Sequence, residues 1–89
     1  MVNSIGSNRQ PEPLNVITYM NEMKWCKAYI EQVNSHCNIN LFIDDIGSDI
    51  ILYQVEGGAN NIIFKTKYVG RMKRELKKTY SYKLYNGKQ

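Results

Sequence analysis

The sequence predicts an α+β protein in which a long N-terminal helix packs on a three- to four-stranded antiparallel meander, followed by a short basic second helix. Three patterns lead to this fold class. Apolar residues recur at helical spacing in the first part of the chain, alternate with polar ones in the middle, and return to helical spacing near the end. With 89 residues, 43% hydrophobic and 22% charged, the chain is expected to form a single domain with a modest core.

The first helix is expected over residues 16–35, with Asn15 as its N-cap. One broad face of this helix carries its apolar residues, namely Val16, Tyr19, Met20, Met23, Cys26, Ile30 and Val33. Trp25 and Tyr29 lie one turn apart on the flank of that face. They are candidates for a protein interface, since Trp and Tyr dominate binding hot spots, and equally for closing the edge of the core.

Three β-rich segments follow, over residues 38–44, 49–56 and 61–67. The second has Ile50 and Leu52 on one face and Ile51, Tyr53 and Val55 on the other. An apolar run on both faces predicts a central strand that is covered on both sides. The meander also leaves an open edge strand, through which the chain can form a homodimer.

The second helix is expected over residues 71–78, where Met72 and Leu76 continue an apolar line that begins at Val69. Residues 79–85 alternate again, which favours a fourth strand or a docking tail. The domain is expected to span residues 13–85. A flexible tail precedes it over residues 1–12, and a frayed C-terminus follows over residues 86–89.

Charge divides the chain into two unequal parts. Residues 64–89 hold nine basic residues and one acid, a net charge of +8, whereas residues 1–63 hold three basic residues and seven acids, a net charge of −4. Such a field acts on partners rather than on the fold. The candidate anion-binding residues are Lys65, Lys67, Arg71, Lys73, Arg74, Lys77, Lys78, Lys83 and Tyr85.

Phosphates suit this cluster, because Arg offers bidentate contacts, Lys offers a point charge, and clustering multiplies counterion release. The alternative is a solvated helix face whose cations offset the dipole at a helix C-terminus. Four tyrosines interleave with the cations and could stack on unpaired bases. We expect Tyr68, Tyr80 and Tyr82 to pack the sheet instead, which leaves Tyr85 as the exposed candidate.

No pattern of residues points to catalysis, a cofactor or a metal. The acidic turn over residues 44–49 lacks the alternate ligands and distant Glu of a calcium loop, so we expect a solvated hairpin tip. His36 is the only histidine and has neither zinc-ligand spacing nor a triad around it. Cys26 and Cys37 are expected to be free thiols.

Two resemblances cover parts of the chain. The α-β-β-β-α order resembles the double-stranded-RNA-binding domain, and residues 68–74 are similar in charge to the basic opening of that family's second helix. The first helix, however, is longer here. Residues 51–55 and 64–71 are similar to later strands of RelE-type ribosome-dependent RNases, which use Lys, Arg and a late Tyr, although the chain lacks that family's first strand and helix pair. Neither resemblance is adopted as a family assignment.

These observations lead to one expected function and two alternatives. The chain is expected to be a small non-enzymatic protein that contacts nucleic acid, or a nucleic-acid-associated complex, through its basic C-terminal helix. The first alternative is a small phage-like inhibitor or adaptor that binds an acidic protein surface, and the second is a RelE-like RNase toxin using Tyr85. Frequent Asn, Ile, Lys and Tyr fit an AT-rich genome, as in small phage and viral accessory proteins and also in many bacterial proteins. Without an apolar span or signal peptide, a cytoplasmic location is expected, in the host cell if the protein is viral.

Overall fold

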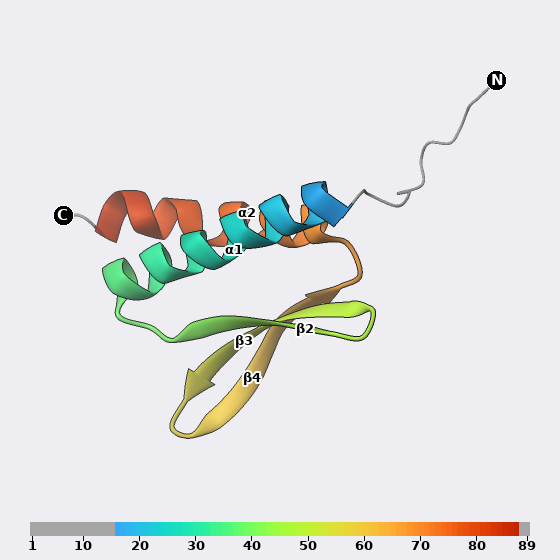
Figure 1. Ribbon diagram of the computed structural model, residues 1–89. Helices are drawn as coiled ribbons and strands as arrows, with labels where there is room; N and C mark the ends of the chain where they lie inside the picture. The colour runs from blue at the N-terminus through green and yellow to red at the C-terminus, as the bar shows by residue number, and fades with distance from the viewer. Residues whose placement is uncertain (1–15, 88–89) are drawn as a thin grey trace.

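The computed structural model describes residues 16–87 and has the α+β arrangement expected from the sequence. Its elements are α1 (Val16–Cys37), β2 (Leu41–Ile46), β3 (Asp49–Glu56), β4 (Ala59–Thr66) and α2 (Val69–Gly87). The strands form one antiparallel sheet in the order β2-β3-β4. Both helices lie side by side over the same face of this sheet, so the molecule has two layers (Figure 1). The tail predicted over residues 1–12 lies outside the described residues.

The two helices run in the same direction because the meander between them has three strands. After an odd number of antiparallel strands, the chain leaves the sheet at the end opposite the one where it entered. The helix α2 therefore starts beside the beginning of α1 (Figure 1). Contacts between the helices follow this order: Lys73 pairs with Glu22 near their N-terminal ends, and Ser81 meets Tyr29 further along.

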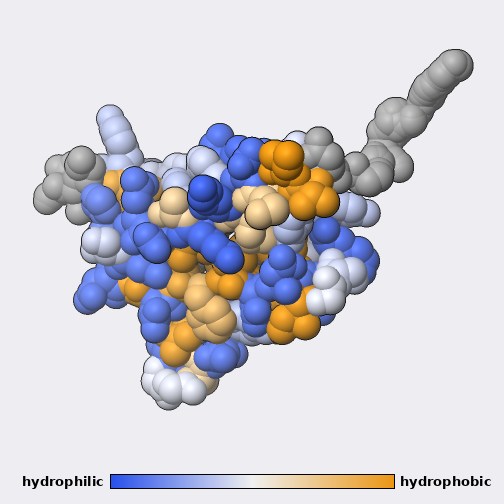
Figure 2. Space-filling view, viewed as in Figure 1, coloured by the Kyte–Doolittle hydropathy of each residue, from blue (hydrophilic) through white to orange (hydrophobic). Residues whose placement is uncertain are grey.

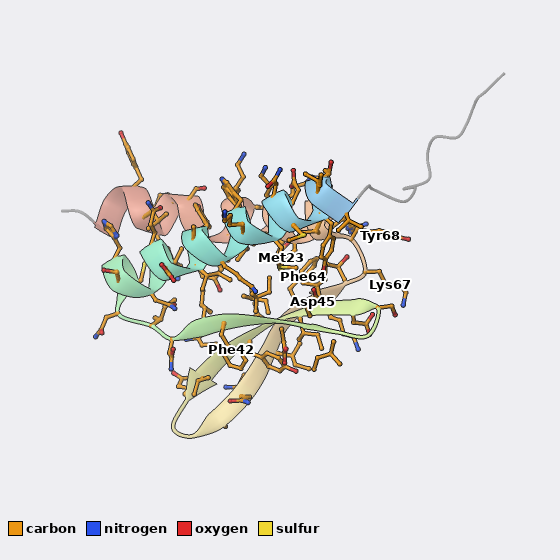
Figure 3. The ribbon with its side chains drawn as sticks, viewed as in Figure 1. Met23, Phe42, Asp45, Phe64, Lys67 and Tyr68 are labelled. Carbon is orange, nitrogen blue, oxygen red and sulfur yellow. The ribbon has the colours of Figure 1, made fainter. Side chains whose placement is uncertain are left out.

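The core lies between the helices and the upper face of the sheet. The helix α1 contributes Met23, Cys26, Ile30 and Val33, a stripe with the expected three- and four-residue spacing. Figure 3 shows Met23 pointing from α1 toward the strands. The remaining buried side chains come from the strands and from α2, and they are Leu41, Ile50, Leu52, Val69, Met72, Leu76 and Tyr80.

Polar contacts fix the connection from α1 to the sheet. Asn38 follows α1 with a φ of 55°, a left-handed conformation that ends helices and that Asn tolerates. The Asn34 side chain then holds the backbone of Leu41 twice: its amide donates to the carbonyl at 2.9 Å, and its carbonyl accepts from the N–H at 2.8 Å. The first strand consequently begins at Leu41, three residues later than predicted.

Residues 79–85 do not form the predicted fourth strand or a docking tail, but continue α2. Tyr80 and Leu84 extend the apolar line of Leu76 at four-residue spacing, and this line packs on the core. Tyr80 is 5% exposed whereas Tyr82 is 75% exposed. A strand would have placed these two side chains on the same face.

The strand β3 is central, as predicted, but it is covered on one face only. Ile50 and Leu52 are buried beneath the helices. Ile51, Tyr53 and Val55 on the other face are only partly buried, because no element of the described chain packs there. The prediction of a strand covered on both sides is therefore wrong.

Candidate nucleic-acid interface

The solvent-facing side of α2 carries a row of cations. The core stripe of α2 places Met72, Leu76 and Tyr80 against the sheet and α1. At 100° per residue, the opposite side of the helix carries Arg71, Arg74 and Lys78. Lys77 lies on the adjoining flank, and all four are exposed. We call these four residues the cationic stripe.

A shallow surface hollow opens within this row. It is lined by Gly70, Lys73, Arg74, Lys77 and Lys78. Gly70 has no side chain and nothing crowds the position where a Cβ would stand, so this side of the helix backbone stays open. Four cationic side chains thus surround a space in which an anion can approach α2 closely.

The position of the stripe along α2 works against the stability of the helix. Because α2 extends to Gly87, the stripe lies in its first half, near the positive end of the helix dipole, and its first turn contains no acid. Of the four residues, Arg71 lies in the first turn, where the dipole acts, so its charge is unfavourable by about 0.3–1 kcal/mol, whereas an anion there is favourable. The sequence-based alternative, in which these cations offset the dipole at a helix C-terminus, therefore does not apply, since the last turn holds no basic residue.

Most of the stripe is electrostatically unpaired within the described residues. No ion pair there involves Arg71, Arg74 or Lys77, and Lys78 lies 3.7 Å from Glu75 in an exposed pair. Such a pair contributes little to stability and can exchange for a phosphate. The stripe is therefore available to an external anion.

Lys73 is held by α1 beside the stripe. Its Nζ lies 3.5 Å from a Glu22 carboxylate oxygen and 5.0 Å from the centre of the Trp25 ring. The ring of Trp25 stacks on Tyr29 with centroids 4.8 Å apart, and the Tyr29 hydroxyl lies 2.9 Å from Ser81 Oγ. Trp25 and Tyr29, the predicted protein-interface residues, are both partly buried and pack against the core in the seam between the helices.

The structure separates three of the predicted cations from the stripe. Lys65 lies on the sheet face turned away from the helices, and Lys67 lies 3.4 Å from Asp49 at one end of the sheet (Figure 3). Lys83 is exposed, but it follows Leu76 by seven residues and thus lies on the sheet-facing side of α2. Of the predicted cations, the structure therefore brings together the cationic stripe and the neighbouring Lys73.

Two exposed tyrosines extend the stripe toward the C-terminal end of α2. Tyr82 and Tyr85 follow Arg71 and Arg74 by eleven residues, which places them at nearly the same angle and about 16 Å further along the helix. Tyr85 is 79% exposed, as expected for the stacking candidate. Tyr68 and Tyr82 are also exposed, so the prediction that they pack the sheet is wrong, while Tyr80 is buried as predicted. The exposure of Tyr82 follows from the helical conformation of residues 79–85, which the sequence analysis did not predict.

The acidic turn and the two cysteines, which the sequence analysis also considered, contribute to the fold. In the acidic turn, Asp45 accepts a hydrogen bond from Tyr19 and Asp49 pairs with Lys67. Both cysteines are free thiols, and burial raises the pKa of Cys26 to about 11, with the nearby charge of Glu22 adding to the effect. Within residues 16–87, no three His, Cys, Asp or Glu side chains gather to hold a metal ion, and neither helix is long and apolar enough to cross a membrane.

Comparison of the chain with known protein families, with curated proteins and with solved structures finds no match. The function is therefore argued from the geometry of α2.

Proposed function

We propose that the protein binds nucleic acid through the solvent-facing side of α2, with Arg71, Arg74, Lys77 and Lys78 on backbone phosphates. The observation that carries the proposal is the exposed, largely unpaired cationic stripe in the N-terminal half of α2, which begins in the first turn with Arg71. The charge of Arg71 in the first turn lowers helix stability, and a phosphate bound there offsets this effect. Lys73 borders the stripe, but its contacts with Glu22 and Trp25 restrict its role.

Two further features support nucleic acid as the polyanion. The exposed rings of Tyr82 and Tyr85 continue the stripe and are suited to stack on bases or to contact sugars beside the bound phosphates. The element order and the basic opening of the second helix are also similar to the double-stranded-RNA-binding domain, which is an analogy of architecture alone. Contacts of this kind fix position and carry little sequence information, so binding is expected to be weakly sequence-specific.

Salt dependence tests the proposal. Gel shifts of a duplex and of a single strand across a salt series should show log affinity falling linearly with log salt. Each phosphate contact contributes about 0.7–0.9 to the slope. The double variant Arg71→Glu plus Arg74→Glu should bind at least about tenfold more weakly, with a slope shallower by about two contacts.

A matched control separates the stripe from net charge. The variant Lys24→Glu plus Lys27→Glu makes the same charge change at two exposed positions of α1. It should keep the salt slope of the unaltered chain. Equal loss in both variants, or no loss in the α2 variant, would contradict the proposal. No shift with any naked nucleic acid would instead point to a protein partner.

A further inference from the structure

The sheet face turned away from the helices is apolar and uncovered. The strand register places six apolar side chains on this face, namely Phe42, Ile46, Ile51, Tyr53, Val55 and Ile62. Ile46 and Ile62 are 59% and 58% exposed. Apolar side chains are visible at the surface over the strands in Figure 2, and Figure 3 shows Phe42 on the side away from the helices. Contiguous apolar patches of this kind mark interaction sites.

Opposite charges flank this apolar face. The register aligns Asp44, Ile51 and Lys65 in one row across the three strands, with Asp44 at the β2 edge and Lys65 at the β4 edge. The two residues are separated by two strand spacings, about 10 Å, and Ile51 lies between them. Among residues 16–87, neither takes part in an ion pair.

This charge arrangement is self-complementary. If two copies stack these faces about a twofold axis parallel to the strands, β2 of one copy lies over β4 of the other. Asp44 of each copy then faces Lys65 of the second copy, and Phe42 of each copy faces Ile62 of the second, since Phe42, Tyr53 and Ile62 share one row. At one of the two sheet edges, β4 is interrupted by a bulge opposite Leu52 and Tyr53, and bulges disfavour pairing at that edge.

We propose that a second copy of this chain covers the open sheet face, so that the protein forms a face-to-face sheet dimer with two Asp44–Lys65 ion pairs. Sheets in such sandwiches pack about 10 Å apart. The helices then form the outer layers, so each dimer presents two cationic stripes on opposite sides. The face is small, because it has three strands of six to eight residues each. We therefore expect a weak dimer with a micromolar dissociation constant.

Sedimentation velocity and light scattering of the full chain test the dimer between about 1 μM and about 1 mM. The mass should rise from the monomer value of 10.4 kDa toward twice that value as concentration increases. A monomer throughout this range would overturn the proposal.

A charge-swap cycle tests the orientation. Asp44→Lys and Lys65→Asp each place like charges opposite one another twice, so each should weaken dimerisation by about tenfold or more. The combined variant restores opposite charges and should dimerise within about threefold of the unaltered chain. The control Glu31→Lys, an exposed charge change on α1, should leave dimerisation unchanged.

Two outcomes separate this proposal from other arrangements. Circular dichroism verifies that each variant is folded, so that loss of the dimer reports the interface. If neither single swap changes the dissociation constant, as expected for a dimer paired through strand edges, the face-to-face arrangement is wrong. The α2 double variant used for nucleic acid should still dimerise, because α2 lies in the outer layer, so each proposal can fail independently.

Discussion

At the scale of single residues, Tyr19 joins the first helix to the sheet. Its hydroxyl donates a 2.6 Å hydrogen bond to Asp45 Oδ2 across the α1–β2 contact. Burial raises the pKa of Tyr19 to about 12, and the hydrogen bond to Asp45 and the charge of that carboxylate add to the effect. The fold therefore favours the neutral phenol.

This contact predicts a loss of stability at high pH. The unfolded chain releases the Tyr19 proton near pH 10, whereas the folded chain keeps it to about pH 12. Because the folded state then holds more protons than the unfolded state, the contribution is complete below pH 10 and is lost between pH 10 and 12. Urea unfolding of Tyr19→Phe should show a smaller fall over this range than the unaltered chain.

The control for this experiment is Tyr85→Phe, because the Tyr85 ring is largely exposed. Its pH profile should follow that of the unaltered chain. The raised pKa of Tyr80, caused chiefly by burial, acts in the same direction in all three proteins and cancels in the comparison. An equal fall in Tyr19→Phe would show that ionisation of Tyr19 does not contribute to the loss of stability.

At the scale of elements, the C-terminal half of α2 gives a second prediction. Tyr80→Ala should lower the free energy of unfolding by about 3 kcal/mol, because it removes a buried aromatic ring that packs on the core. Tyr85→Ala should change the free energy by less than about 0.5 kcal/mol, since that ring is exposed. Urea unfolding measures both. Similar effects at the two positions would contradict the helical assignment of residues 79–85.

The same segment shows where sequence patterns are ambiguous. The alternation of Tyr80, Tyr82 and Leu84 is compatible with a strand, while Leu76, Tyr80 and Leu84 are compatible with a helix. The choice is made by tertiary packing, because only the helix continues the buried line that starts at Val69. By contrast, α1 was predictable because its apolar residues keep one helical period, and β3 because its run of β-branched and aromatic residues lies between two turn sequences.

At the scale of the whole molecule, the sequence predicts the helices and strands better than it predicts which face of the molecule each side chain lies on. The cations from Lys65 to Lys83 are close in sequence, but the meander and the helix present them to different sides of a two-layer molecule. That separation depends on strand register and on which sheet face the helices cover. The apolar residues on both faces of β3 did indicate a central strand. One of these faces is open because the described chain has no third layer to cover it.

The two-layer arrangement leads to a final prediction about cooperativity. Leu52 is fully buried at the centre of the sheet beneath both helices, so Leu52→Ala should cost about 2–5 kcal/mol. Ile51→Ala, on the open face of the same strand, should cost less than half as much in the monomer. Because one core joins every element, helix dichroism and Trp25 fluorescence should give coincident urea transitions in both variants. Equal losses at the two positions, or transitions that separate by probe, would contradict a single core on one face of the sheet.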